Sequence, residues 1–527
     1  MHWADHTALR LGDRGGAQVS CSGITPSGEF HVGHLREILS AEMIHRACLD
    51  AGLESEYVFI VDSMDPLRRV YDFLSDSYER YIGHPLAYIP APGPDGEPGD
   101  GSTSYAEHFL NPFLKALEEI GVSPRVVMNH ETYESGGFAE SIDRSISMKG
   151  EIRGIIESIS GRELDDDWFP YNPRDSEGSL DGVTITGYEK PYVQWIDSHG
   201  VEGRSDIRKA EGKLPWRVDW AARWIIHGIT CEPAGKDHGA AGGSYDTGIP
   251  ICRLLGGKPP DKMTYEWIQL KGMGAMSSSS GLTIGPMEAL ELVPPQIMRY
   301  IIARSKMGRH IEFDTGPSLF QVAEEYERLV SEPPKEEEGM SKRQKVAVST
   351  QEGAIRLSQL VRGSEPSESI GGVSFSHLSM LAQIKKSDEG VWSSLRKSGH
   401  LAGEPSTSLV GRLTRMRAWI GGPHFPEDGR VRILTGEKGE VRAEIGQEGL
   451  AFLEALCLAL EGGEWDYESI GTRIREAADK VGITRREGYT TLYRILLGRD
   501  YGPKASTLIG EMARDDFVVL ASSYFHD

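Results

Sequence analysis

Short β-rich runs alternate with helical patterns between Ala17 and about Ile302, and this alternation restricts the possible folds more than any other feature of the chain. A helix usually connects two parallel strands, so regular alternation predicts an α/β fold with a parallel sheet covered by helices. The predicted helices include Leu35–Ala51 and Tyr105–Ile120, each of which ends before a glycine. The predicted strands are Val19–Ile24, Tyr57–Val61, Arg125–Met128, Ile229–Glu232 and Met263–Leu270.

The chain has 527 residues, which is too long for one ordinary domain and suggests roughly two to four. The turn-rich segment Arg162–Lys213 interrupts the alternation, and we interpret it as an insertion with short strands at Val183–Thr186 and Tyr192–Ile196. The polar stretch 331–345 indicates a boundary or an exposed loop. We therefore expect a first domain over residues 1–315, with its insertion at about 162–213, and a mainly α-helical region over residues 316–527. Helical patterns in that second region lie at His377–Lys386, Ser408–Trp419, Gly449–Leu460, Tyr467–Val481 and Gly488–Leu497.

The charge balance is acidic, with a formal net charge of −22. This argues against a non-specific nucleic-acid coat or a membrane-surface protein, although one local basic face is enough to bind RNA. The N-terminus lacks the apolar core of a signal peptide, and no run approaches the roughly 18 apolar residues of a membrane span, so we expect a cytoplasmic protein. The five cysteines are scattered and form no C-x-x-C pair, which supports neither a disulfide framework nor a cysteine zinc site.

The first predicted strand is followed by a loop of small residues and then by a helix, with His31-Val32-Gly33-His34 at the junction. A parallel sheet binds its ligand beyond the carboxyl ends of its strands. A helix start offers unpaired N–H groups and a partial positive charge, which favour a phosphate group. The segment therefore predicts a nucleotide triphosphate site, and the alternative is a solvated histidine pair at a helix start.

A second segment, Lys271–Gly281, reads KGMGAMSSSSG and follows the last predicted strand. Its N–H and hydroxyl groups could surround a phosphate chain, and the alternative is a flexible linker. An early H-x-G-H and a late M-S-S-S within one parallel-sheet domain are more specific together than either is alone. The pair resembles the HIGH and KMSKS signatures of class I aminoacyl-tRNA synthetases.

Five further segments narrow this resemblance to the class I lysyl-tRNA synthetases. They are T-P-S-G at Thr25–Gly28, D-x-x-D-P-L-R at Asp62–Arg68, G-K-L-P-W-R-V-D-W at Gly212–Trp220, E-P-A-G-K-D-H at Glu232–His238 and G-G-S-Y-D-T-G at Gly242–Gly248. The likeness covers most of residues 17–315 and continues more weakly at Leu496–Gly498 and Tyr501–Lys504. It implies a Rossmann-like parallel-sheet catalytic domain with an insertion, followed by a mainly α-helical anticodon-binding domain.

The chain departs from the family pattern in two places. Ala275 and Ser280 stand where the family usually has lysines flanking the loop serines, which puts the strength of pyrophosphate stabilisation in doubt. Many members carry cysteine zinc sites in the insertion, whereas Arg162–Lys213 contains no cysteine and one histidine, His199. We therefore expect no zinc and no other protein-bound metal.

The resemblance implies a lysine–tRNA ligase, which activates L-lysine with ATP to lysyl-adenylate and transfers the lysyl group to tRNA(Lys) in translation. Mg²⁺ is expected to arrive with the ATP, and the expected oligomeric state is a monomer. Two alternatives remain open at this point. One is a non-catalytic synthetase paralogue that binds tRNA or lysine, and the other is an adenylating enzyme whose acceptor is not tRNA.

The resemblance also assigns roles to individual residues. Lysine carries two ammonium groups, which carboxylates and aromatic faces complement. We therefore add the carboxylate of Asp62 to the lysine pocket, because Asp62 stands at the carboxyl end of the predicted strand Tyr57–Val61. The alternatives are a helix or turn cap for Asp62 and a core tryptophan for Trp216. The expected catalytic residues are His31, His34, Ser277, Ser278 and Ser279; the expected ATP-binding residues are Pro26, Ser27, Gly28, His31, Gly33, His34, Asp237 and Met276; and the expected lysine-binding residues are Gly23, Thr25, Asp62, Trp216, His238 and Tyr265.

Overall fold

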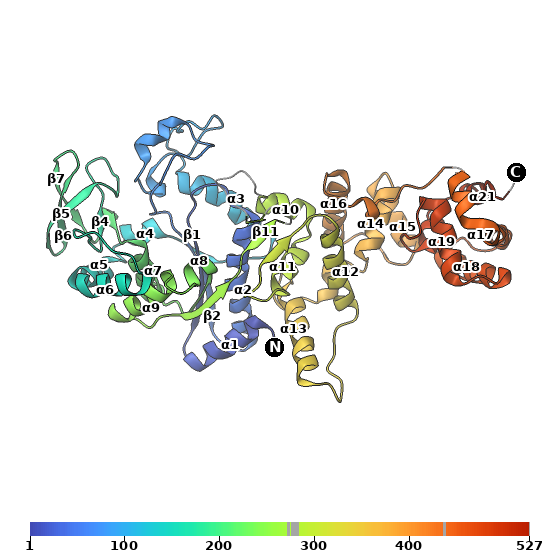
Figure 1. Cartoon of the computed structure of the whole chain (residues 1–527), viewed down its shortest axis with the longest axis horizontal. Coiled ribbons are helices and arrows are strands. Elements are labelled where there is room, and N and C mark those ends of the chain that lie inside the picture. Colours follow the sequence, from blue (N-terminus) through green and yellow to red (C-terminus); the bar gives the residue numbers. More distant parts are fainter. Residues whose placement is uncertain (271–273, 276–283, 436–438, 526–527) are drawn as a thin grey trace. The chain divides into compact units, whose positions relative to one another are not determined.

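The computed structural model describes residues 1–270, 274–275, 284–435 and 439–525, and these residues form two compact units (Figure 1). Unit 1 consists of Met1–Leu290, Pro295–Phe313 and Pro333–Ser364, and unit 2 of Glu291–Pro294, Asp314–Glu332 and Glu365–Asp527. Compared with the expected boundary near residue 315, this division assigns residues 333–364 to unit 1 and residues 291–294 to unit 2.

Unit 1 is built on a five-stranded parallel sheet, which confirms the predicted α/β fold. Strand β1 is almost wholly buried and pairs with β2 from Gln18 opposite Ser55 to Ile24 opposite Val61. The carboxyl ends of the strands therefore meet at one edge of the sheet. The strand order is β10 (Asp261–Tyr265), β9 (Cys231–Gly235), β1 (Gln18–Ile24), β2 (Ser55–Val61) and β3 (Arg125–Met128).

Helix α2 (Leu35–Asp50) connects β1 to β2 and packs against β1, β2 and β9. It follows a single 3-10 turn, η1 (Val32–His34), and ends near Gly52, whose positive φ of 77° suits a residue without a side chain. Helix α3 (Tyr105–Glu119) connects β2 to β3 and begins with a capping box between Ser104 and Glu107. Both helices end within two residues of the predicted positions.

The helices that follow the insertion complete the core of unit 1. Helices α7 (Trp216–Ile226) and α9 (Ser244–Leu254) pack together. Their buried aromatic residues join a cluster that also contains Cys21 and Ile60 of the sheet. Helices α1 (Trp3–Arg14), α11 (Pro295–Ala303) and α13 (Lys342–Leu357) contact α2. The short helix α8 (Lys236–Gly239) directly follows β9.

The predicted strand Met263–Leu270 is wrong as a single element. It divides into β10, in the five-stranded sheet, and β11 (Ile268–Leu270), in a second sheet with β12 (Gly274–Ala275) and β13 (Ile311–Phe313). The chain leaves the first sheet because the Glu266 N–H donates to the Met307 carbonyl at 2.9 Å, and the Ile311 N–H donates to Trp267 at 3.0 Å. The segment Lys271–Gly281 therefore follows β11 in the chain.

The insertion forms small antiparallel sheets after helices α4 (Asn129–Glu134), α5 (Ala139–Ser147) and α6 (Lys149–Ser160). Asp175 holds one turn by accepting backbone N–H groups of three following residues at 2.7–2.9 Å, and Asp197 holds another by accepting two at 2.9 Å. Within the described ranges, no group of three or more His, Cys, Asp or Glu side chains could hold a metal ion. The strands of the insertion are β4 (Asn172–Pro173), β5 (Val183–Glu189), β6 (Tyr192–Asp197), β7 (Glu202–Asp206) and β8 (Gly212–Lys213).

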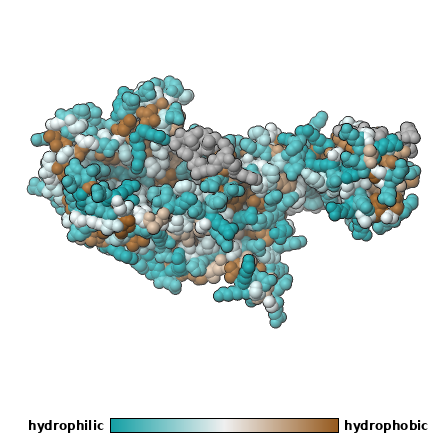
Figure 2. Space-filling model, in the orientation of Figure 1, coloured by the Kyte–Doolittle hydropathy of each residue, from teal (hydrophilic) through white to brown (hydrophobic). Residues whose placement is uncertain are grey.

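The described part of unit 2 contains helices and no strand. Across the described residues of both units, no helix is long and apolar enough to cross a membrane. Hydrophilic residues dominate the face shown in Figure 2, and the hydrophobic ones are scattered among them. The main helices of unit 2 are α12 (Pro317–Ser331), α14 (Phe375–Ile384), α15 (Asp388–Lys397), α16 (Thr407–Gly421), α17 (Gly439–Leu460), α18 (Tyr467–Val481), α19 (Arg485–Leu497), α20 (Ala505–Gly510) and α21 (Arg514–Ser522).

Candidate functional site

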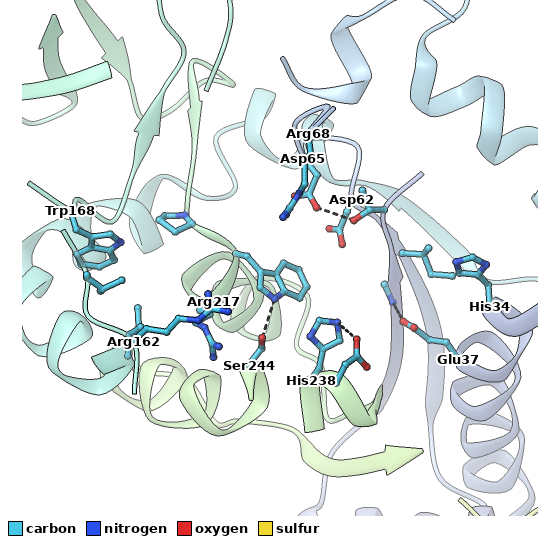
Figure 3. Close-up of a pocket in the computed structure, with 18 residues that line it drawn as sticks. His34, Glu37, Asp62, Asp65, Arg68, Arg162, Trp168, Arg217, His238 and Ser244 are labelled. Carbon is cyan, nitrogen blue, oxygen red and sulfur yellow. Dashed lines mark hydrogen bonds and ion pairs between the residues drawn. The ribbon is translucent and has the colours of Figure 1, made fainter. Parts of the chain in front are cut away.

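A cavity of about 740 Å³ lies at the carboxyl ends of the parallel strands in unit 1 (Figure 3). Gly23 stands near the end of β1, Asp62 directly follows β2, and Asp237 lies on α8 after β9. The insertion contributes Arg162 and Trp168 to the opposite wall. This is where a parallel sheet places its ligand, because the loops that follow the strands meet there.

The structure brings together some of the predicted site residues and not others. Those that line the cavity are Gly23, Thr25, His34, Asp62, Trp216, Asp237 and His238. Those that do not line it are Pro26, Ser27, Gly28, His31, Gly33 and Tyr265. Met276, Ser277, Ser278 and Ser279 lie outside the described residues.

The two histidines of the H-x-G-H segment are fixed by backbone groups at the start of η1. The Gly33 N–H donates to His31 Nδ1 at 3.1 Å, and the His31 N–H donates to His34 Nδ1 at 3.0 Å. With Nδ1 of His31 accepting, the ring proton of His31 lies on Nε2. His34 Nδ1 also lies 3.1 Å from the His31 carbonyl, so its proton lies on Nε2 when Nδ1 accepts the His31 N–H and on Nδ1 when it donates to that carbonyl. Burial lowers the pKa of His31 to about 4 and, together with the neighbouring His31, that of His34 to about 3. Both rings are therefore neutral N–H donors at pH 7.

The T-P-S-G loop lies beside these histidines. Its Ser27 carbonyl accepts a hydrogen bond from the Tyr105 hydroxyl at 2.8 Å. A Cβ atom at Gly28 would stand 3.4 Å from the ring of Phe73, so the aromatic ring closely approaches the loop backbone. The Thr25 hydroxyl donates to Asp65 at 2.9 Å, which ties the start of the loop to the cavity.

Five buried ionic side chains form a cluster at the cavity, which we call the ion cluster: Asp62, Asp65, Asp219, Lys213 and Arg223. Arg223 contacts both Asp62 and Asp219. Lys213 Nζ lies 3.2 Å from an Asp65 oxygen and 3.4 Å from an Asp219 oxygen. Three carboxylates and two cations leave one negative charge in excess when all are ionised.

Burial and the neighbouring charges shift the pKa of two cluster carboxyl groups, Asp62 and Asp219, in opposite directions. Burial raises the pKa of Asp62 to about 7 despite the neighbouring Arg223. Burial also opposes ionisation of Asp219, but Arg223 and Lys213 outweigh it and lower the pKa of that carboxyl. The protein thus satisfies the charge of Asp62 less well than that of Asp219, and an additional cation would stabilise ionised Asp62.

Aromatic rings form the wall beside the ion cluster. Trp216 is half-buried and lines the cavity, whereas Trp220 and Trp224 on the same helix are buried. The Trp216 ring stacks on Trp220 with centroids 5.3 Å apart, and its Nε1–H donates to Ser244 at 3.3 Å. His238 lies 5.8 Å from the Trp216 ring centre. The guanidinium carbon of Arg223 lies 5.1 Å from the Trp216 ring centre, so this ring already borders one cation. The part of the half-buried ring that lines the cavity, beside buried carboxylates, suits an alkylammonium group.

Glu37 is a cavity residue that the sequence reasoning missed. Its carboxylate accepts the Gly23 N–H at 2.8 Å and the Tyr265 hydroxyl at 2.9 Å, and burial raises its pKa to about 8. Tyr265 is buried and does not line the cavity. Its hydrogen bond to Glu37 connects it to the cavity. The available signal was its spacing, because Glu37 lies three residues after His34 on the same face of a helix.

Asp65, Lys213 and Arg223 were also missed as site residues. Asp65 and Lys213 occur in the motifs quoted above, but their residue types alone do not show that they meet. Arg223 follows Asp219 by four residues within a tryptophan-rich helix. A charged pair at this spacing in an otherwise apolar helix was a usable sign of a buried ion pair.

The chain is similar to one family model and to several known proteins. Residues 1–353 match the family model described as "tRNA synthetases class I (K)". The lysine–tRNA ligase of Thermoplasma acidophilum is 36% identical over 521 residues, covering 98% of this chain and 97% of that protein. That of Archaeoglobus fulgidus is 37% identical over 513 residues, covering 97% of each. A solved glutamate–tRNA synthetase from Elizabethkingia anophelis shares 12% identity with a TM-score of 0.42, covering 97% of this chain and 100% of the other.

The family model covers well over half of the chain, and the two lysine–tRNA ligases match it almost from end to end. The motif order in the sequence and the parallel sheet that carries those motifs agree with this match. The resemblance found in the motifs is confirmed: the chain belongs to the class I lysyl-tRNA synthetase family.

Proposed function

We propose that this chain is a lysine–tRNA ligase that activates L-lysine with ATP and transfers the lysyl group to tRNA(Lys). The observation that carries the proposal is the ion cluster at the cavity, with its excess negative charge beside the face of Trp216. Family membership and the names of the full-length relatives support it. The two alternatives gain no support from these observations.

In this proposal the ion cluster receives the ε-ammonium group of lysine. A bound monocation would balance the excess charge and stabilise ionised Asp62, while the aliphatic chain lies against Trp216. Gly23, Thr25 and His238 complete the lysine pocket, and Tyr265 supports it through Glu37. Asp237 lies 3.4 Å from His238 and is assigned to the adenylate ribose or the α-amine.

The first chemical step needs charge stabilisation more than proton transfer. The lysine carboxylate is already ionised at pH 7, so it can attack the α-phosphorus of ATP without a general base. A carboxylate oxygen–phosphorus bond forms, the bond to the β-phosphate breaks, and pyrophosphate leaves. The neutral rings of His31 and His34, each with its proton on Nε2, would donate to phosphate oxygens, because fixed donors stabilise charge that develops in the transition state.

The remaining ATP contacts come from the loops around these histidines. The backbone of Pro26, Ser27, Gly28 and Gly33 would contact ATP, with the Met276–Ser279 segment acting at the departing pyrophosphate. We expect Mg²⁺ to be held by the ATP phosphates and water, because Mg²⁺ keeps several waters and binds through substrate phosphates. In the second step a ribose hydroxyl of the tRNA attacks the lysyl carbonyl, and AMP leaves.

The proposal places the protein in the cytoplasm as a monomer, which sedimentation would test. Its direct test is charging: the purified protein, ATP and labelled lysine should aminoacylate tRNA(Lys) from a mixed tRNA pool. Charging of no tRNA while lysine transfers to another acceptor would instead support the adenylating alternative. Binding of tRNA or lysine without adenylate formation would support the non-catalytic one.

A further inference from the structure

Helix α2 contains a buried arginine that the proposed chemistry does not use. Arg36 lies in the first turn of α2, two residues after His34, and its side chain is fully buried. Arginine is rarely buried without a carboxylate partner, because removing its charge from water is costly. Burial lowers the pKa of Arg36 to about 10, so the group remains charged at pH 7. Among the described residues it forms no ion pair with a carboxylate, and its contacts are with backbone carbonyls and one sulfur.

The guanidinium group of Arg36 binds the segment that connects α11 to β13. Its Nη1 donates to the Ile302 carbonyl at 3.2 Å, and its Nη2 donates to the Lys306 carbonyl at 3.1 Å. Nη2 also lies 3.8 Å from the sulfur of Met307. Helix α11 packs against α2 (Figure 1), and the carbonyl groups at its end carry partial negative charge, which a cation stabilises.

The same segment, residues 302–307, holds the junction between β10 and β11. The Met307 carbonyl accepts the Glu266 N–H at 2.9 Å, and the Ile311 N–H donates to the Trp267 carbonyl at 3.0 Å. These hydrogen bonds draw the chain out of the five-stranded sheet and lead it into β11, which pairs with β13. Helix α2 is thus joined to the start of β11 through a short series of hydrogen bonds within unit 1.

The turn η1 contacts this region directly. It packs against β11, and the N–H of its buried residue Val32 donates to the Ile284 carbonyl at 2.9 Å. The turn η1 contains His34, and β11 precedes the segment Lys271–Gly281 in the chain. The elements that carry the two predicted phosphate-binding segments therefore lie side by side, and Arg36 bonds α2 to the segment that supports β11.

The rate of adenylate formation depends on how closely such elements are held in place. Fixed donors stabilise developing charge only if they are already in position, and a displacement of about 1 Å can cost about 100-fold in rate. Groups at a reaction site are kept within about 0.5 Å by side chains that are themselves locked by packing and hydrogen bonds. A guanidinium suits this purpose because it is planar and can bond two carbonyl groups at once.

We propose that Arg36 is a positioning residue for adenylate formation: it fixes helix α2, with the histidines at its start, against residues 302–307 and the junction of β10 and β11. The kinetic part of this inference rests on the proposed function, because it takes adenylate formation as the reaction. Arg36 does not line the cavity and acts only through other groups. An apolar side chain could fill the same space, but it would not bind the two carbonyl groups.

Arg46 provides a matched control on the same helix. Its side chain is also buried, and it forms an ion pair with Glu42. It donates to three backbone carbonyls at 2.6–2.9 Å, those of Gln359, Gly121 and Leu360. Arg46 therefore anchors the far end of α2, as Arg36 anchors its start, but its partners lie outside residues 302–307 and the junction of β10 and β11.

The test compares Arg36→Gln with Arg46→Gln in the full-length protein. Glutamine keeps a donor but cannot bond both carbonyl groups of residues 302–307. In rapid-quench experiments with saturating lysine, ATP and tRNA(Lys), formation of lysyl-adenylate should slow about 10- to 100-fold in Arg36→Gln and less than about twofold in Arg46→Gln. The dissociation constant for lysine should change less than about threefold in both variants, because neither side chain contacts the ion cluster.

Hydrogen exchange followed by mass spectrometry supplies a readout that needs no activity. In Arg36→Gln, peptides that contain the amides of Val32, Glu266 and Ile311 should exchange faster, because these N–H groups bond within the region that Arg36 holds. In Arg46→Gln these peptides should exchange as in the wild type. If Arg36→Gln yields no soluble protein, Arg36→Lys should show the same pattern to a smaller extent, because lysine keeps the charge and lacks the planar fork.

Three results would overturn the inference. They are adenylate formation at the wild-type rate in the Arg36 variant, equal slowing in the Arg36 and Arg46 variants, and unchanged exchange at Glu266 and Ile311. Equal slowing would show that α2 needs anchoring in general and that Arg36 has no special role. If the wild type forms no adenylate, the proposed function fails; faster exchange confined to the Arg36 variant would then still support the positioning role, and unchanged exchange would refute it.

Discussion

Replacing Asp62 by asparagine tests the charge argument for lysine recognition. The substitution keeps the shape of a buried side chain and removes the excess negative charge of the ion cluster. Two unit charges about 4 Å apart attract by about 4 kcal/mol at an effective dielectric constant of 20. Asparagine still offers an oxygen dipole, so we expect a loss of about 2–4 kcal/mol, which corresponds to about 30- to 1,000-fold weaker lysine binding.

The same residue predicts how lysine binding depends on pH. Only ionised Asp62 attracts the ammonium, and its pKa is about 7, so lysine affinity should rise with pH up to about 7 and then level off. Below that value affinity should fall about tenfold per pH unit, because protonation removes the attraction. The lysine ε-amine does not contribute to this change, since its own pKa is about 10.4.

Titration calorimetry of lysine binding between pH 5.5 and 8.5 is the appropriate assay. Asp62→Asn should bind weakly and should lose the pH dependence centred near 7, which leaves only the titration of Glu37 near 8. Asp167→Asn, at an exposed position in the insertion, should behave as the wild type. Wild-type affinity for lysine in Asp62→Asn, or the same pH profile in both proteins, would refute the assignment of the ammonium to the ion cluster.

Four further outcomes are expected. His34→Ala should lower the rate of pyrophosphate exchange by about 100-fold or more with little change in lysine affinity, because it removes a fixed donor to the phosphates; full exchange activity would reduce His34 to a structural role. Glu37→Leu leaves the Gly23 N–H and the Tyr265 hydroxyl unpaired, so it should lower the free energy of unfolding in urea by about 1–3 kcal/mol for each of these buried groups. Glu37→Gln should lower it less, and equal stability of the two variants would contradict the role of the Glu37 hydrogen bonds. Lysine should be activated about 10- to 200-fold better than ornithine, which lacks one methylene, and equal rates with glutamine would exclude a lysine pocket. Chelators should leave the circular dichroism spectrum unchanged, since carboxylates such as Asp175 and Asp197 hold the turns of the insertion; stoichiometric zinc whose removal unfolds the protein would show otherwise.

The sequence predicts the sheet of unit 1 well because its signals are local. Strands β1 and β2 are short apolar runs, and α2 has an apolar face and a glycine after its end. The split between β10 and β11 could not be seen in this way, because the apolar–polar alternation from Met263 to Trp267 continues across Glu266, where β10 has already ended. The break depends on hydrogen bonds to residues some forty positions later, which local patterns do not reveal.

The return of residues 333–364 to unit 1 was hidden for the same reason. Arg46 donates to the carbonyls of Gln359 and Leu360, and Gly121 closely approaches the Leu360 backbone. These contacts join positions more than two hundred residues apart. A polar stretch after Phe313 resembles a boundary in the sequence, and only tertiary packing shows that the chain crosses back.

The candidate site was predictable where a motif follows a strand. Thr25, Asp62 and His238 reach the cavity because the carboxyl ends of parallel strands meet at one edge. The ion cluster was not predictable, since a sequence shows that Lys213 and Arg223 are charged but not that they are buried together. Their pairing with three carboxylates emerges only when β8 and α7 pack beside the end of β2.

Lysine-dependent exchange of labelled pyrophosphate into ATP tests the central claim most directly, because it reports adenylate formation by the cavity itself. The assay should be run with and without tRNA(Lys), and with each of the other standard amino acids in place of lysine. We predict exchange with lysine, in at least one of the two tRNA conditions, that is far above the rate with any other amino acid. No exchange in either condition, or equal exchange with another amino acid, would contradict the proposed function.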